Sequence, residues 1–108
     1  IDFAVLLGNA LDNAIEAAER MQKGNREVSL SIITKGETIV MIIRNPVGEK
    51  LDVNHLMTTK ADTKSHGFGL LQMQQLTRKY GGDLLLDCSD EEFKTTIILG
   101  NNANEQVD

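Results

Sequence analysis

Aromatic side chains are scarce in this chain, making up 4% of its 108 residues, and tryptophan is absent. A core built from this composition must therefore be aliphatic, filled mainly by Leu, Ile, Val and Met. Hydrophobic residues still amount to 41%, which is typical of a globular rather than a disordered protein. The length suits one domain with a single core.

The chain also contains few cysteines, few positive charges and no long apolar run. The single cysteine, Cys88, cannot form an internal disulfide, which fits a reducing compartment, and we interpret it as a small buried hydrophobic residue. The net charge of −5 argues against nucleic acid as a partner, because phosphate-backbone binding needs a basic surface. No apolar run approaches the ~20 residues of a membrane span, and we expect no signal peptide in this stretch. The sequence starts on a helical pattern without an initiator Met, so we expect a fragment of a longer protein.

The spacing of apolar residues predicts two helices. The first covers residues 3–22 and ends at Gly24-Asn25; its apolar positions recur every three or four residues at Phe3, Leu7, Leu11, Ala14, Ala18 and Met21. The second covers residues 68–80 and ends at two glycines, with an apolar face formed by Leu70, Met73, Leu76 and Tyr80.

Four strands are predicted beside these helices. Residues 27–34 and 37–44 form a hairpin, and residues 83–88 and 93–99 supply the other two strands, with Phe93, Thr95, Ile97 and Leu99 on one face. Residues 45–66, opened by Pro46, lose all periodicity; an irregular segment this long is often functional. The resulting order, α-β-β-loop-α-β-β, predicts a two-layer α/β sandwich, with a polar tail at 101–108.

One stripe of the first helix is unusual, because at ~100° per residue it gathers two asparagines beside acidic residues. Its members are Asn9, Asp12, Asn13, Glu16 and Arg20. Asn is a poor helix-interior residue, and a solvated face usually carries Lys, Glu and Arg instead. Nearby small residues leave room for a ligand to approach: Ala10, Ala14 and Ala17. An amide oxygen with a neighbouring carboxylate suits a hydrated Mg²⁺.

A second candidate site is the glycine-containing start of the second helix. Gly67 and Gly69 would let a phosphate approach the free N–H groups of the helix N-terminus. They follow the clustered cations of the irregular segment, Lys60, Lys64 and His66. Together with the asparagine stripe, these features predict binding of a nucleoside triphosphate with Mg²⁺. The absence of GxxxxGK[ST] excludes a P-loop.

These motifs resemble those of the GHKL ATPases (gyrase, Hsp90, histidine kinase, MutL). NALDNAIEAAE is similar to their N box, and HGFGLLQMQQLTRKYGGDL to the second glycine box of bacterial sensor histidine kinases. NALDNAIEA, with TTK before HGFGL, is most similar to the peptide-sensing, quorum-type kinases. The resemblance covers residues 3–99. It implies a Bergerat-type α/β sandwich, a mixed sheet covered by helices on one face, and an ATP-binding catalytic domain over residues 1–100.

The resemblance also implies roles for individual residues. Asn13 matches the Mg²⁺-binding asparagine, with Asp12 and Glu16 as support for the water shell of the ion. Asn9 matches the upstream catalytic position of the N box. Phosphates would be held by backbone N–H groups of Gly67, Phe68, Gly69 and Leu70, with Lys60, Lys64 and His66 on the lid that covers ATP.

The function implied is transfer of the γ-phosphoryl group of ATP to a histidine on a dimerisation domain that is absent here, with a response regulator downstream. The parent would be a membrane-anchored bacterial homodimer, and this chain a cytoplasmic part of it. His55 and His66 both lie in the irregular segment, outside a helical phospho-acceptor context.

The sequence departs from the family at the adenine-reading DxGxG, where it has NPVGE. Asn45 would take the place of the carboxylate, and Gly48 would be the remaining glycine. Two other interpretations therefore stay open: an anti-sigma-type GHKL serine kinase, or a degenerate docking domain that no longer catalyses.

Overall fold

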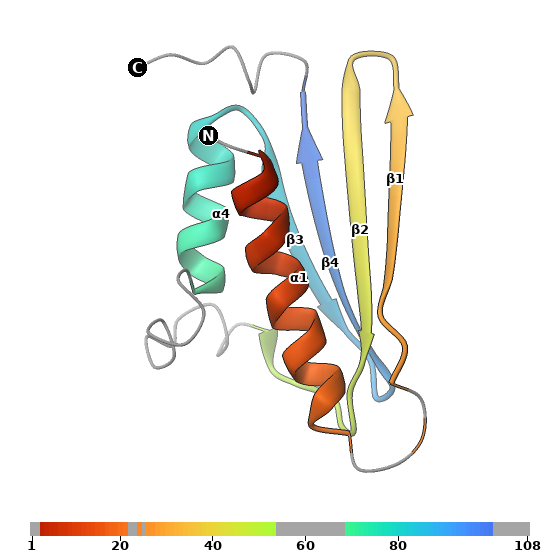
Figure 1. Cartoon of the computed structure of the whole chain (residues 1–108). Helices are drawn as coiled ribbons and strands as arrows, with labels where there is room; N and C mark the ends of the chain where they lie inside the picture. The colour runs from red at the N-terminus through yellow and green to blue at the C-terminus, as the bar shows by residue number, and fades with distance from the viewer. Residues whose placement is uncertain (1–2, 22–23, 25, 54–68, 101–108) are drawn as a thin grey trace.

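The computed structural model describes residues 3–21, 24, 26–53 and 69–100. The elements in these ranges follow one another as α1 (Phe3–Glu19), β1 (Ser29–Lys35), β2 (Thr38–Pro46), α4 (Leu70–Lys79), β3 (Asp83–Cys88) and β4 (Glu92–Leu99) (Figure 1). The predicted order of helices and strands is confirmed. The predicted tail at 101–108 lies outside the described residues.

The strands form one sheet in the order β1-β2-β4-β3. All three pairings between these strands are antiparallel, so the prediction of a mixed sheet is wrong for the described part of the chain. The physical reason is the connectivity. Two hairpins give antiparallel neighbours, and the second hairpin places β4, not β3, against β2, which makes the third pairing antiparallel as well.

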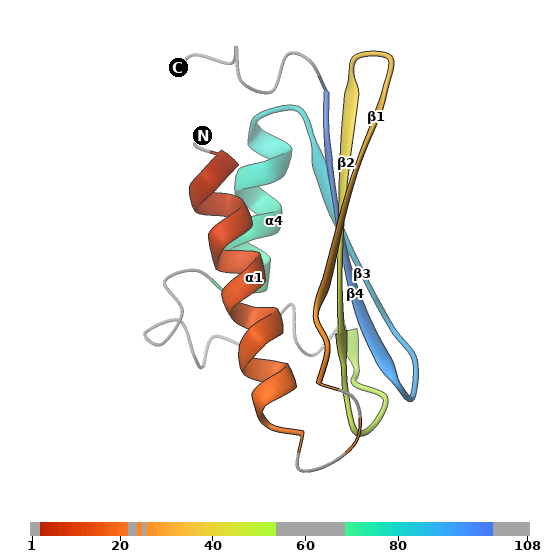
Figure 2. The same cartoon turned by 45° about the vertical axis from the view of Figure 1, so that its right-hand side comes forward.

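Both helices lie on the same face of the sheet, and no described helix or strand covers the other face (Figure 2). α1 packs on β2, and α4 packs on β3. The predicted two-layer α/β arrangement with helices on one face is therefore confirmed. α4 begins level with the middle of α1 and runs beside it (Figures 1 and 2), so the start of α4 and the asparagine stripe of α1 lie in the same region of the fold.

The core lies between the helices and the inner face of the sheet. Its buried members are Leu6, Ala10, Ala14, Met41, Ile43, Met73, Leu84, Ile97 and Leu99. The alternation predicted for residues 93–99 is confirmed, since Phe93, Thr95, Ile97 and Leu99 are all buried. Ala10 and Ala14 are 4% and 3% exposed. Their small side chains let α1 lie close to the sheet, so the interpretation that they leave room for a ligand is wrong; Ala17 alone of that group is half-buried.

Two element boundaries differ from the prediction. α1 ends at Glu19, three residues early. The Arg20 N–H is shared between the Glu16 and Ala17 carbonyls, and the Met21 N–H bonds to the Ala18 carbonyl, three residues back, which tightens the last turn. β2 continues to Pro46, although the sequence pattern predicts that this proline opens the irregular segment. Proline is acceptable there because it ends the strand. Asn45 is therefore a strand residue.

A tight corner joins α4 to β3. Gly81 has φ 87°, a left-handed conformation that favours glycine, and the Gly82 N–H donates to the Thr77 carbonyl at 2.9 Å. Arg78 Nε donates to Asp83 Oδ1 at 2.8 Å, and this hydrogen bond holds the pKa of the Asp83 carboxyl below its usual value. Thr77 is fully buried, with its hydroxyl donating to the Met73 carbonyl.

Candidate functional site

The asparagines of α1 lie beside the buried face of the helix. Asn9 and Asn13 directly precede Ala10 and Ala14, which face the sheet, and both asparagines are half-buried. Neither side-chain amide has a hydrogen-bond partner within the described ranges. Two amides that are partly withdrawn from water and one helical turn apart can therefore receive a polar ligand on this flank of α1.

The two acidic residues of the stripe differ in their exposure to solvent. Asp12 is exposed, whereas Glu16 is half-buried and its Oε1 lies 3.9 Å from Arg20 Nη2. An exposed pair of this kind adds little to stability. It does, however, direct the Glu16 carboxylate toward the end of the helix, which makes Asp12 the more available of the two acids.

The side chains of α1 can supply only one or two oxygen ligands to Mg²⁺. Among residues 3–21, 24, 26–53 and 69–100, no group of three His, Cys, Asp or Glu side chains could hold a metal ion. Mg²⁺ commonly keeps several waters and takes one or two protein oxygens together with substrate phosphates. The Asn13 amide and the Asp12 carboxylate suit that mode of binding, and do not suit a site made wholly of protein ligands.

Asn45 is the most deeply buried polar residue predicted for the site. It is 4% exposed, lies on the helix side of β2, and pairs with Phe93 of β4. Its Nδ2 donates to the Pro46 carbonyl at 3.1 Å, so its Oδ1 must point elsewhere. No residue of the described ranges donates to that oxygen. A buried acceptor without a donor is costly, and here it offers a hydrogen-bonding position to a ligand.

Thr95 is a polar residue of this region that sequence reasoning did not select. It lies two residues along β4 from Phe93, so it is a diagonal neighbour of Asn45 on the inner face. It is 6% exposed, and its hydroxyl has no partner among the residues that the structure describes. The signal was available: a threonine occupies a position of the buried face predicted for residues 93–99.

The start of α4 carries the described part of the predicted phosphate-binding segment. Gly69 is the N-cap, and Leu70, the first helical residue, packs against the core. The Gly69 N–H donates to Gln72 Oε1 at 2.9 Å. Gln72, which the sequence analysis did not single out, thus occupies one of the N–H groups predicted to bind phosphate. Lys60, Lys64, His66, Gly67 and Phe68, together with His55, lie outside the described residues.

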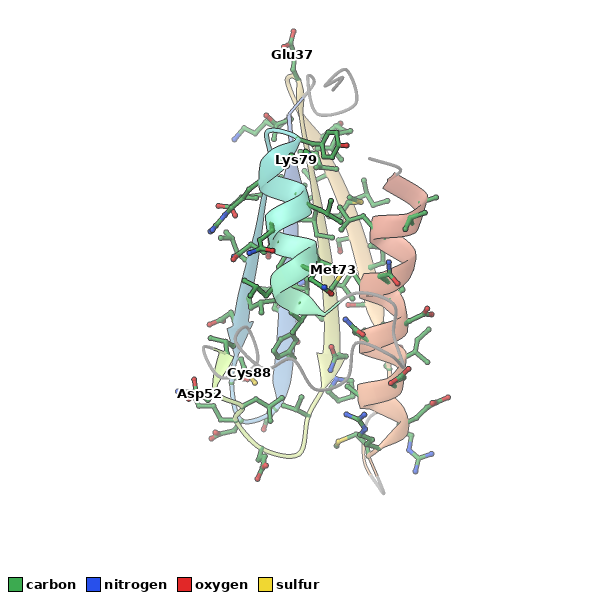
Figure 3. The ribbon with its side chains drawn as sticks, turned by 90° about the vertical axis from the view of Figure 1, so that its left-hand side faces the viewer. Glu37, Asp52, Met73, Lys79 and Cys88 are labelled. Atoms are coloured by element: carbon green, nitrogen blue, oxygen red, sulfur yellow. The ribbon has the colours of Figure 1, made fainter. Side chains whose placement is uncertain are left out.

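The segment that follows β2 is fastened to the β3–β4 hairpin. Val47 N–H donates to the Glu91 carbonyl at 3.1 Å, and Leu51 N–H donates to Cys88 Sγ at 3.3 Å. Asp52 and Cys88 accordingly lie at the same end of the molecule, opposite Glu37 and Lys79 (Figure 3). The prediction that Cys88 is buried is confirmed, at 8% exposed, and its sulfur also helps to hold the chain where it leaves β2.

Comparison with known proteins agrees with this geometry. Residues 1–100 match the family model described as GHKL domain. The chain is 28% identical over 96 residues to the sensor histidine kinase DpiB of Escherichia coli (strain K12), an alignment that covers 82% of this chain and 17% of that protein. The chain therefore spans about a sixth of the length of this relative. In the described part of the chain, no helix is long and apolar enough to cross a membrane. Because the family model matches nearly the whole chain, this protein belongs to the GHKL family.

Proposed function

We propose that this chain is the catalytic, ATP-binding domain of a bacterial sensor histidine kinase. It would bind MgATP and donate the γ-phosphoryl group to a histidine on a separate dimerisation domain of its parent. Membership of the GHKL family supports ATP as the ligand, and similarity to a sensor histidine kinase supports the class of reaction. A homodimeric, membrane-anchored parent and a downstream response regulator belong to the same proposal.

The single observation that carries the proposal is the buried polar pair of Asn45 and Thr95. The bond from Nδ2 to Pro46 orients the Asn45 amide and leaves its Oδ1, which can only accept, for a ligand. An acceptor matches the 6-amino group of adenine, whereas the 6-oxo group of guanine would bring two acceptors together. The Thr95 hydroxyl can donate or accept beside it. The pair therefore suits ATP better than GTP.

Replacing Asn45 by Leu tests the base site. We expect Asn45→Leu to weaken ATP binding about tenfold, because one buried hydrogen bond to the base is lost, while an apolar side chain of similar size keeps the fold. Asn45→Asp should retain ATP binding, since a carboxylate also accepts from the amino group. Isothermal titration calorimetry with ATP and GTP measures both effects.

The matched control is Gln74→Ala, which removes a half-buried amide of α4 that donates to the Leu84 carbonyl and should leave ATP affinity unchanged. Equal affinities for ATP in Asn45→Leu and the unsubstituted chain, both folded by circular dichroism, would refute the base site. No ATP binding by the unsubstituted chain would instead favour the docking-domain alternative, which the amide in place of the family's carboxylate supports.

The asparagine stripe would act on the phosphates. Bound Mg²⁺ neutralises the charge of the β- and γ-phosphates. Asn13 would offer its amide oxygen to the ion, and Asp12 and Glu16 would accept hydrogen bonds from its waters. Asn9, one turn earlier, would orient the acceptor group, so its replacement should lower phosphoryl transfer more than ATP binding.

Gln72 would compete with the phosphates at the start of α4. Its side chain accepts from the Gly69 N–H, and a phosphate oxygen needs the same donor. We expect Gln72→Ala to lower the free energy of unfolding without ligand by about 1 kcal/mol and to tighten ATP binding, because the competing acceptor is gone. Gln75→Ala, an exposed position on the same helix, is the control. Chemical denaturation and calorimetry give the two readouts, and weaker ATP binding by Gln72→Ala would show that Gly69 does not contact phosphate.

A further inference from the structure

β1 lies at an edge of the sheet. In the strand order it comes first, with β2 as its neighbour, and Figure 1 shows it at one side of the sheet. Its outer side pairs with no strand of the described ranges. The backbone N–H and C=O groups on that side can therefore pair with a strand from another chain.

Large apolar side chains of β1 are exposed on both faces of the sheet. Leu30 and Ile32 lie on the helix side, opposite the buried Ile43 and Met41, yet they are 40% and 56% exposed. Ile33, on the open face, is 50% exposed. Because α1 packs on β2 and α4 on β3, the helix layer stops short of these side chains. The apolar surface thus follows the edge strand itself.

β1 also lacks the features that protect an edge strand from association. Its register with β2 runs without a bulge from Ser29 to Lys35. The strand contains no proline, and its one charged residue, Lys35, lies at its end. Soluble proteins usually protect an exposed edge with bulges, prolines or central charges. Their absence suggests that this edge is covered by another strand.

We propose that β1 pairs antiparallel with β1 of a second copy of this chain, which joins two sheets into one across a two-fold axis at Ser31. In this register Leu30 lies opposite the partner's Ile32, and the symmetric contact repeats the pair. Both pairs lie on the helix side, so two of the three exposed apolar side chains of the strand, Leu30 and Ile32, cover each other. The contact is isologous, as a two-fold axis requires.

Charge complementarity favours self-pairing in this register. Glu27, two residues before β1, comes opposite the partner's Lys35, and this contact also occurs twice. A register with Ile32 on the axis would instead bring Ser29 opposite the partner's Lys35, and this pairing of opposite charges would be lost. The strand is thus complementary to itself in both apolar and charged positions.

The extent of the contact sets the strength that we expect. One pair of short strands buries less than the ~1,600 Å² of a standard interface, so the dimer should be weak and reversible. The inference is independent of the proposed nucleotide site, and its test uses no nucleotide.

Sedimentation equilibrium of the whole chain, at protein concentrations up to about 1 mM, measures the association expected of such a small interface. We expect a monomer–dimer equilibrium whose dissociation constant rises at least tenfold in Ile32→Lys. The matched control is Leu85→Lys, which places the same charge at a 47% exposed position on β3, the opposite edge strand, and should leave the dimer unchanged. Lys35→Glu should weaken association, and adding Glu27→Lys should restore it.

Cross-linking tests the position of the two-fold axis. Ser31→Cys should form a disulfide-linked dimer under mild oxidation, because the two Ser31 residues face each other across the axis. Leu85→Cys should not, and the unsubstituted chain should not, since its Cys88 is buried. A chain that stays monomeric at every concentration, an equal loss of association in Leu85→Lys, or cross-linking at Leu85→Cys and not at Ser31→Cys would each overturn the proposal.

Discussion

Gly82→Ala is expected to lower the free energy of unfolding by about 3 kcal/mol, a large share of the stability of a small domain. A methyl group at Gly82 would collide with the backbone carbonyl oxygen of Ile98, and would lie 2.9 Å from Leu99 Cδ2 and 3.2 Å from Thr77 Cγ2. The carbonyl cannot easily move, because Ile98 pairs with Asp83 in the sheet. The damage should therefore spread to the junction of α4, β3 and β4.

Two other glycines separate this steric effect from backbone effects. Gly81 has φ 87°, and a methyl group added there would meet open space, so Gly81→Ala should cost roughly 1 kcal/mol from its conformation alone. A methyl group added at Gly100 would also meet open space, and Gly100 has no left-handed φ. The free energy of unfolding of Gly100→Ala should therefore stay within about 0.5 kcal/mol of that of the unsubstituted chain. Urea denaturation followed by circular dichroism gives the three values. A Gly82→Ala variant as stable as Gly100→Ala would show that β4 yields at this point.

The strands were the most predictable part of the fold, because their alternation is a direct consequence of having one covered face. The predicted limits of residues 83–88 are the observed ones, and those of residues 93–99 agree to within one residue. The ends of α1 and β2 depend on tertiary structure instead. The end of α1 depends on a tightened last turn, and the extension of β2 through Asn45 and Pro46 depends on pairing with Phe93 and Glu92, which local sequence does not reveal.

Exposure on β1 could not be predicted either. Leu30 and Ile32 alternate with polar residues just as buried strand residues do, and the sequence pattern cannot tell whether a helix will cover them. Their exposure follows from the strand order, which puts β1 at the edge and leaves α1 over β2.

Sequence alone could single out candidate site residues where the residue type is unusual, as for Asn9 and Asn13 inside a helix, and their roles stay predictions. It could not do so where a role depends on neighbours distant in sequence or on a side chain's direction. Thr95 becomes notable only because β4 places it diagonally to Asn45, and Gln72 only because its side chain turns back to the N–H of Gly69.

Asn13→Ala is expected to change stability and ligand binding in opposite directions. Alanine is the better helix former by about 0.5 kcal/mol, and the Asn13 amide has no hydrogen bond to lose within the described ranges. The free energy of unfolding should therefore rise slightly. If Asn13 offers its oxygen to Mg²⁺, the affinity for ATP measured with Mg²⁺ should at the same time fall to the value measured with EDTA.

The opposite signs make this substitution more informative than a simple loss of binding. A residue kept only for the fold would show lower stability on replacement, and a residue of a solvated surface would change neither property. Glu19→Ala serves as the control, since Glu19 is exposed on the same helix outside the asparagine stripe and should leave Mg²⁺-dependent binding intact. Calorimetry with and without Mg²⁺ and urea denaturation measure the two properties on the same preparations. Undiminished Mg²⁺-dependent binding by Asn13→Ala would refute the metal assignment, whereas loss of binding in a more stable protein would show that α1 carries this asparagine for its ligand at the expense of the helix.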